Sequence, residues 1–211
     1  MSKFPDPPGV AALRDIAPQT LVLPADTKLT RIYFATGPYP SHWNQFRSFG
    51  PTAARWDHHL PNAHGAGVEQ KRAVYYCAPH VDTCVGEVFQ STRRIDRTRN
   101  APALVIFALR EPVTLLDLRG AFATKMGAST AIHSGPRSRA RAWARELYDA
   151  YPELQGLHYG SSMNGHAPAV ALNERAQSAM PEQPLFHRAL NDDMLVEVLQ
   201  QIALRLSYGL R

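Results

Sequence analysis

Strand-like segments outnumber helical ones in this sequence, and the two kinds do not alternate regularly. Alternating or aromatic-rich runs, which are typical of β-strands, cover residues 29–35, 72–78, 103–110, 113–118, 156–162 and 169–174. Helical periodicity is limited to residues 81–89, residues 137–151 and a segment that begins near Asn191. Because a doubly wound parallel sheet needs a helix between successive strands, this order predicts an α+β fold.

The three predicted helices are amphipathic, and each is expected to bury one face. The first carries an apolar stripe of Val81, Cys84, Val85, Val88 and Phe89. The second places on one face Ala140, Trp143, Ala144, Leu147, Tyr148 and Tyr151. The third, with Asn191 as its predicted cap, is expected to bury Met194, Leu195, Val198, Leu199 and Ile202.

The remaining segments frame one domain without a visible linker. Residues 1–28 contain five prolines and are expected to form an extended arm on the domain surface. Residues 36–70 show no periodicity, as is typical of a functional or mobile loop. We therefore predict a single domain over residues 1–211, with a core of 29–175 and a C-terminal helix extension of 185–211.

The composition indicates a soluble globular protein, since 45% of the residues are hydrophobic and 19% are charged. No apolar run approaches the roughly 20 residues that span a bilayer, and the first ten residues lack the apolar core of a signal peptide. Cys77 and Cys84 are the only cysteines. Two are too few for a disulfide framework, so we expect reduced core side chains and a cytoplasmic protein.

The formal charge is +5, and of 23 basic residues only four are lysines. Arginine presents a planar fork that suits phosphate, so a phosphate-bearing ligand or nucleic acid is worth considering. The alternative is a GC-rich genome, which favours arginine codons. The arginine run at residues 93–99 contains no interleaved aromatic residue, so we do not predict direct nucleic-acid binding.

Common cofactor and metal motifs are incomplete in this sequence. No dinucleotide-binding, P-loop or nucleophile-elbow pattern is fully present. His58, His59 and His64 fall in a predicted loop, but adjacent histidines rarely converge on one ion and no cysteine or carboxylate cluster accompanies them. We therefore predict no metal site.

Glu87 interrupts the apolar run of the 81–89 helix. With about 100° of rotation per residue, its side chain projects away from the buried stripe. A polar helix position of this kind usually faces water. The alternative is that Glu87 faces a cleft in which a negative charge is needed.

Four segments, taken in order, resemble the RES domain family, which is named for its arginine, glutamate and serine. They are LTRIYF with Arg31, AARWD with Arg55, VYYCAPHVDTCVGEV with Tyr76 and Glu87, and GLHYGS with Ser161. The sequence departs from the family pattern at Ala54, where glycine is usual, and at Asp57, where asparagine is usual. Gln155 likewise replaces a common aspartate.

The resemblance implies an ADP-ribosyltransferase-like fold of mixed and antiparallel sheets with flanking helices. It also implies a toxin that consumes or uses NAD+ as its substrate, and a cognate antitoxin with a helix-turn-helix domain as its partner. Arg31, Glu87 and Ser161 are the implied catalytic residues, and the implied NAD+-binding residues are Arg31, Arg55, Tyr76, Glu87 and Ser161. Arginines suit the diphosphate, and Tyr76 could stack on nicotinamide or bond a ribose hydroxyl. Ser161 would hold the ribose or Glu87.

Cleavage of the nicotinamide–ribose bond develops positive charge on the sugar, which a carboxylate such as Glu87 stabilises. Water, phosphate or a protein could accept the ADP-ribose, so an ADP-ribosyltransferase is one alternative function. A basic nucleic-acid-binding module without catalysis is another. Tyr75 must point to the opposite sheet face from Tyr76, so we expect one of the two in the core. The sequence leaves open whether the chain forms a homodimer.

Overall fold

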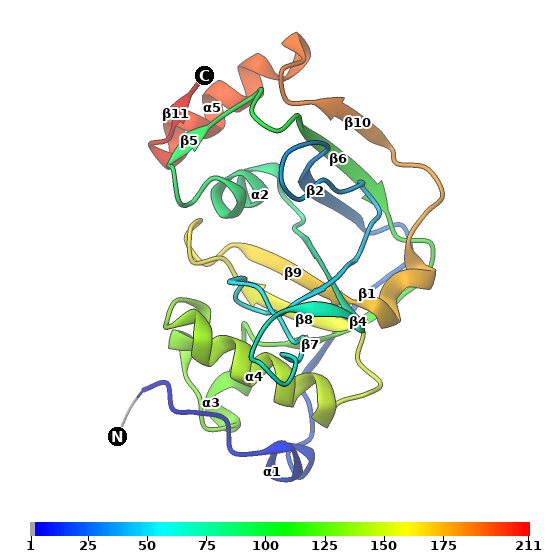
Figure 1. The fold of residues 1–211 in the computed structure, drawn as a ribbon, viewed down its shortest axis with the longest axis vertical. Helices are drawn as coiled ribbons and strands as arrows, with labels where there is room; N and C mark the ends of the chain where they lie inside the picture. Colours follow the sequence, from blue (N-terminus) through cyan, green and yellow to red (C-terminus); the bar gives the residue numbers. More distant parts are fainter. Residues whose placement is uncertain (1–2) are drawn as a thin grey trace.

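The computed structural model describes residues 3–211, which form two packed β-sheets with helices against their outer faces (Figure 1). The larger sheet has six strands in the order β1-β7-β8-β9-β4-β3. In that order, their bounds are Thr20–Leu23, Val113–Asp117, Gly156–Gly160, Pro168–Asn173, Val68–Cys77 and Arg47–Gly50. All its strand pairs are antiparallel except β7 with β8, which is parallel.

The smaller sheet is wholly antiparallel, in the order β10-β6-β2. Its strands are β10 Phe186–Ala189, β6 Pro102–Ala108 and β2 Lys28–Phe34. A short parallel pair, β5 Arg94–Ile95 with β11 Gly209–Leu210, lies near the C-terminus. Mixed and antiparallel sheets with flanking helices confirm the predicted α+β class.

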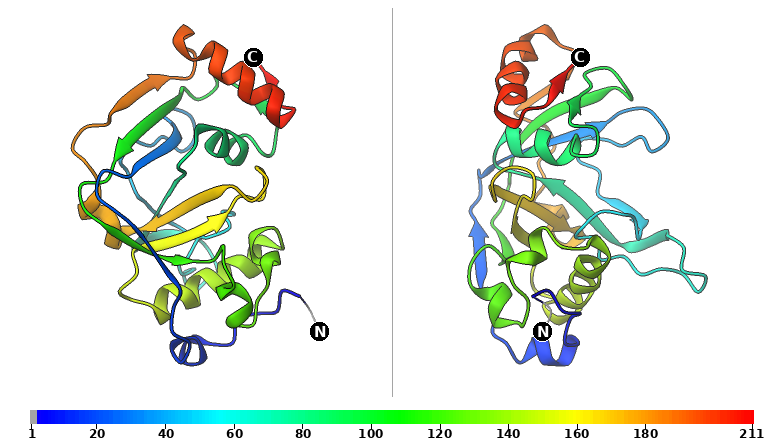
Figure 2. Two further views of the ribbon diagram at one scale, coloured as in Figure 1. Left: turned by 180° about the vertical axis from the view of Figure 1, so that it is seen from behind. Right: turned by 90° about the vertical axis from the view of Figure 1, so that its left-hand side faces the viewer.

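The α-helices lie in two groups: α1, α3 and α4 lie at one end of the molecule, and α5 lies at the other end with α2 nearer the middle (Figure 1, Figure 2). Beside the larger sheet are α1 Val10–Arg14, α3 Phe122–Lys125 and α4 Arg137–Ala150. Beside the smaller sheet are α2 Val81–Val88 and α5 Val196–Leu206. The 3-10 turns are η1 Thr130–His133, η2 Glu174–Ala179 and η3 Asp193–Leu195.

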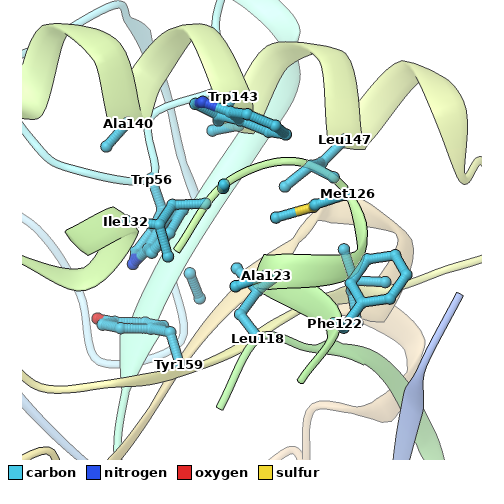
Figure 3. Close-up of a cluster of buried hydrophobic side chains, with 14 of the residues drawn as sticks. Trp56, Leu118, Phe122, Ala123, Met126, Ile132, Ala140, Trp143, Leu147 and Tyr159 are labelled. Atoms are coloured by element: carbon cyan, nitrogen blue, oxygen red, sulfur yellow. The ribbon is translucent and has the colours of Figure 1, made fainter. Parts of the chain in front are cut away.

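Three main apolar cores follow from this layering. One lies between the larger sheet and α3–α4, where Trp143 and Leu147 of α4 pack toward Trp56 and Tyr159 (Figure 3). A second joins the two sheets and includes Leu29, Phe107 and Tyr75. The third joins the smaller sheet to α2 and α5 through residues such as Cys84, Val85 and Leu199.

The predicted helix at 81–89 is confirmed as α2, and its stripe is buried as expected, with Cys84, Val85 and Phe89 almost inaccessible. The helix at 137–151 is confirmed as α4. All six predicted strands are present, although β4 begins at Val68 rather than at residue 72. The strands around Glu111-Pro112 are not partners of each other, because the turn carries the chain from the smaller sheet to the larger one.

Two predictions near the ends of the chain were wrong in detail. Residues 3–28 are not simply extended, since they form α1 and the edge strand β1, which pairs with β7. Asn191 does not cap the last helix: Asp192 caps the preceding 3-10 turn η3, where its side chain accepts from the Met194 amide, and α5 itself follows Leu195 without a side-chain cap. Met194 is 71% exposed and Val198 43% exposed, because Met194 lies in the 3-10 turn η3 and Val198 lies at the edge of the buried stripe of α5, which consists of Leu199, Ile202 and Ala203.

The loop between β2 and β4 is more ordered than its composition indicates. It contains β3 and a buried segment in which His58 and His59 are nearly inaccessible, whereas His64 is exposed. Cys77 and Cys84 are both buried and unpaired. Among residues 3–211, none of the helices combines the length and apolar character that a membrane-spanning segment requires.

Candidate active site

Glu87 lies in the last turn of α2, at the end of the helix that follows β4. The apolar stripe of α2 packs in the core that this helix shares with the smaller sheet and α5. Glu87 lies on another side of α2 and points away from that core. Its Oε1 accepts a hydrogen bond from Ser161 Oγ at 2.6 Å. Glu87 is half-buried. The structure therefore brings together two residues that are 74 positions apart in the sequence.

Ser161 is buried at the end of β8, where a turn leads into β9. Its Oγ donates to Glu87 and accepts from the amides of Met163 and Asn164, both at 3.1 Å. A hydroxyl has one donor and two acceptor lone pairs, so this set uses its full capacity. The Ser161 hydroxyl is thus fixed by three hydrogen bonds, and its one proton is directed to Glu87.

A second bond fixes the same turn to α2. Asn164 Nδ2 donates to Thr83 Oγ1 at 3.0 Å, and Thr83 is fully buried. Thr83 and Glu87 are one helical turn apart, so they project from neighbouring positions on one side of α2. The turn after β8 therefore bonds to two successive turns of α2, through Thr83 and through Glu87.

Arg55 lies near Glu87 and is anchored by backbone carbonyls. Its Nη1 donates to Gly135 O at 2.7 Å and to Ile132 O at 3.3 Å. Burial lowers the pKa of Arg55, the like charge of Arg137 lowers it further, and the Glu87 carboxylate opposes both effects. The remaining nitrogens of Arg55 form no ion pair with any carboxylate of residues 3–211.

Arg137 is a second guanidinium beside this site that the sequence did not single out. It is exposed at the start of α4, and its Nη2 donates to Gln90 Oε1. Gln90 Nε2 in turn donates to the backbone carbonyl of Glu87 at 2.6 Å. Two like charges with a single nearby carboxylate leave a net positive site, which favours an anionic ligand.

Tyr76 and Tyr159 add phenol groups to the cluster. Burial raises the pKa of both, and the Glu87 charge raises each further, so both phenols stay protonated at neutral pH. The Tyr76 hydroxyl is buried and has no hydrogen-bond partner among residues 3–211. Tyr75 points to the other face of β4, where it is fully buried and donates to Trp43 O at 2.7 Å. The expectation that one of the two tyrosines belongs to the core is confirmed.

His133 lies behind Arg55 and packs against the turn that follows Ser161. Its Nδ1 accepts from the Gly160 amide at 3.3 Å and its Nε2 donates to Leu118 O at 3.0 Å, which fixes the tautomer. The ring centroids of His133 and His166 are 4.7 Å apart. Burial lowers the pKa of His133 to about 4, and the nearby His166, Arg55 and Arg119 contribute to this shift.

Arg31 is the predicted site residue that the structure does not join to this cluster. Its guanidinium carbon lies 4.1 Å from the centre of the Tyr75 ring, on the opposite face of β4 from Tyr76. Within residues 3–211, no hydrogen bond or ion pair connects Arg31 with Glu87, Arg55 or Ser161. The structure therefore brings together Glu87, Ser161, Arg55 and Tyr76, and leaves Arg31 apart.

The loop that presents Arg55 is held by Asp57, which has no exposed surface. Asp57 Oδ2 accepts from Arg47 Nη2 at 3.0 Å and from the amide and hydroxyl of Thr52 at 2.7 Å, and Oδ1 pairs with His59 Nδ1 at 2.5 Å. Burial alone would raise its pKa, but the bonds from His59 and Thr52 and the charge of Arg47 hold the pKa of Asp57 well below its usual range.

Sequence reasoning missed Tyr159, Arg137, Gln90 and His133. Tyr159 could have been found from the sequence. Residues two positions apart in a strand lie on the same face of the sheet, and Tyr159 lies two positions before Ser161. No pattern in the sequence places the start of α4 against the end of α2. No cluster of three or more metal-ligating side chains is present in the described part of the chain.

These features define an α+β domain in which a serine-held carboxylate lies beside a positively charged pair. The chain belongs to the RES domain family, whose sequence model matches residues 28–193. Its fold is similar to that of a chain in the crystal structure of the M. tuberculosis MbcT–MbcA toxin–antitoxin complex, with a TM-score of 0.54 and 16% identity. That alignment covers 86% of this chain and 91% of the other. No curated protein matches the sequence.

Proposed function

We propose that this protein cleaves the nicotinamide–ribose bond of NAD+ and acts as the toxin of a type II toxin–antitoxin pair. The observation that carries the proposal is the Glu87 carboxylate, which Ser161 fixes beside the Arg55 guanidinium. Membership of the RES domain family supports it, and so does the fold similarity to a chain of a toxin–antitoxin complex.

Glu87 supplies the charge that the reaction needs. Loss of nicotinamide leaves an electron-poor, oxocarbenium-like ribose, which a nearby carboxylate stabilises. Because Ser161 occupies Oε1, Oε2 is the oxygen available to the sugar or to an incoming nucleophile. A carboxylate held in advance needs no reorganisation as the charge develops, and this is the main source of such stabilisation.

Arg55 and Arg137 are suited to the diphosphate of the same substrate. Neither has a carboxylate partner in an ion pair among residues 3–211, so phosphate oxygens would relieve the repulsion between them. Tyr76 and Tyr159 stay protonated and can donate to ribose hydroxyls. A direct role for Arg31 remains a prediction, since it reaches this cluster only if the substrate extends past β4 to the Tyr75 face.

Nicotinamide release from NAD+ by the purified protein tests the proposal. Glu87→Gln is expected to lower kcat at least about 100-fold, whereas Glu182→Gln, at a side chain that is 88% exposed, serves as the matched control. Absence of turnover by the wild type, with or without phosphate or a protein acceptor, would count against the proposal. Full activity of Glu87→Gln would remove the role of that residue.

The acceptor of the ADP-ribose distinguishes the main alternative. Transfer of label from NAD+ to a protein band would identify an ADP-ribosyltransferase, and free ADP-ribose or a phosphorylated product would identify hydrolysis or phosphorolysis. The exposed side chains of Arg93, Arg94 and Arg99 favour a second candidate, a nucleic-acid-binding module. Salt-dependent RNA or DNA binding by a protein that is inert toward NAD+ would support it.

The proposed partner is an antitoxin with a helix-turn-helix domain. Co-expression with such a protein is expected to give a stable complex that no longer releases nicotinamide. Size-exclusion chromatography of the chain alone and of the complex would also show whether the chain forms a homodimer.

A further inference from the structure

The turn of α2 that carries Glu87 is the last turn of that helix. The final four carbonyls of a helix lack amide donors one turn ahead, so other groups must satisfy them. In α2 the carbonyls on both sides of the Glu87 α-carbon accept from side chains: Gly86 O accepts from the Tyr208 hydroxyl at 3.2 Å, and Glu87 O accepts from Gln90 Nε2 at 2.6 Å. The backbone on either side of the Glu87 α-carbon is therefore fixed by side chains.

Tyr208 belongs to residues 194–211, which lie beyond the segment matched by the RES domain model. It is 7% exposed, and a Cβ added to Gly86 would lie 3.7 Å from Leu206 Cδ1. Leu199, Ile202 and Ala203 of α5 share a core with Cys84 and Val85 of α2. Residues 194–211 thus cover the buried face of α2 and also contact its final turn. Figure 1 shows α5 on the side of α2 that faces away from the larger sheet.

We propose that residues 194–211 position the catalytic carboxylate, and that Tyr208 is the positioning residue through its bond to Gly86 O. The inference rests on the proposed function, in which Glu87 acts on NAD+. Without the hydroxyl, a buried carbonyl next to Glu87 loses its donor, and the final turn of α2 relaxes to reach another one. The carboxylate then no longer keeps its place relative to Ser161 and Arg55, although every substrate-contacting group is still present.

Tyr208→Phe removes this one bond, and Tyr151→Phe provides a matched control. Tyr151 is also buried, and its one hydroxyl proton is shared between two backbone carbonyls of the N-terminal segment, Leu13 O at 2.7 Å and Ile16 O at 3.0 Å. Both variants are expected to lower Tm by about 2–4 °C. Only Tyr208→Phe is expected to lower kcat for NAD+ cleavage, by about tenfold, with KM unchanged within about twofold.

Equal kcat values for the two variants would overturn the inference and leave the proposed function standing, because the wild type would still release nicotinamide. Hydrogen exchange gives a measurement that does not depend on turnover. Amides of residues 86–90 are expected to exchange about tenfold faster in Tyr208→Phe than in the wild type, and at the wild-type rate in Tyr151→Phe. Unchanged exchange in Tyr208→Phe would also refute the positioning role, whatever the protein does to NAD+.

Discussion

Replacement of Asp57 by asparagine is expected to destabilise the protein strongly, because Asp57 is a buried charge surrounded by donors. Its two oxygens accept from Arg47, from both donors of Thr52 and from His59. An asparagine amide must turn its NH2 group toward one of these donor sets. The variant therefore loses the charge and also places donor against donor in a site without solvent access.

The size of the effect follows from the burial of this network. Breaking a buried ion pair by removal of one partner costs about 3–5 kcal/mol. For a chain of this length, an unfolding entropy of about 2.1 cal/mol/K per residue converts that cost into a Tm lower by about 7–11 °C. Asp6→Asn is the matched control, since Asp6 pairs with Arg139 Nε at 3.1 Å but is 81% exposed. Its cost is expected to stay below about 1 kcal/mol.

Thermal and urea unfolding at pH 7 measure the difference, and a pH series tests its cause. The pKa of Asp57 is lowered in the folded state, so its stabilisation is complete above the unfolded value of about 3.9 and is lost as pH falls toward the folded value. Wild type and Asp57→Asn should therefore converge in stability below about pH 4. A variant within about 1 kcal/mol of wild type at pH 7, or a constant difference down to pH 3, would refute this account.

Three further predictions concern the site. Ser161→Ala is expected to lower kcat by about 10–100-fold, whereas Ala at the exposed neighbour Ser162 leaves it unchanged; equal activities would contradict the orienting role. Arg137→Gln is expected to raise KM for NAD+ about tenfold with kcat retained, compared with Arg110→Gln, a side chain 58% exposed; the same KM in both variants would exclude Arg137 from the diphosphate. His133 has a pKa of about 4, so protonation of the unfolded imidazole destabilises the protein as pH falls from about 6.5 to about 4. Titration of His133 by NMR should show a midpoint near 4, and a midpoint above 6 would contradict its burial.

The fold class could be predicted because strand and helix periods are local properties of the sequence. The buried stripe of α2 and the buried face of α4 could be predicted from the helical spacing of apolar residues alone, and both predictions agree with the structure. The prediction that Met194 and Val198 are buried failed because Met194 lies in the 3-10 turn η3, outside α5, and Val198 lies beside the stripe of Leu199 and Ile202 that α5 buries. Similarly, the edge strand β1 depends on a partner, β7, that is about 90 residues away.

Sequence motifs could predict individual residues of the candidate site, but they could not predict which of these residues lie close together in the fold. Glu87, Ser161, Arg55 and Tyr76 come together because α2, the turn after β8 and the 51–57 loop meet at one end of the larger sheet. Arg137 and Gln90 belong to no motif, since their relation to Glu87 arises only from the packing of α4 near the end of α2. Asp57 looked like a departure from the family pattern, yet its carboxylate accepts from the residues that shape the Arg55 loop.

Both ends of the chain contact the segments that hold Arg55 and Glu87, the two charges that the proposed reaction needs. In the N-terminal segment, the Phe4 ring packs so tightly on Gly135 that a Cβ there would lie 2.7 Å from it, and the Gly135 carbonyl anchors Arg55. At the other end, Tyr208 fixes the turn that carries Glu87. Because Phe4 contacts Gly135 and Tyr208 contacts Gly86, and these contacts lie at different ends of the chain, a change at Phe4 should affect the proposed diphosphate binding, whereas a change at Tyr208 should affect the proposed bond cleavage. A change at Phe4 is therefore expected to act mainly on KM, and a change at Tyr208 mainly on kcat.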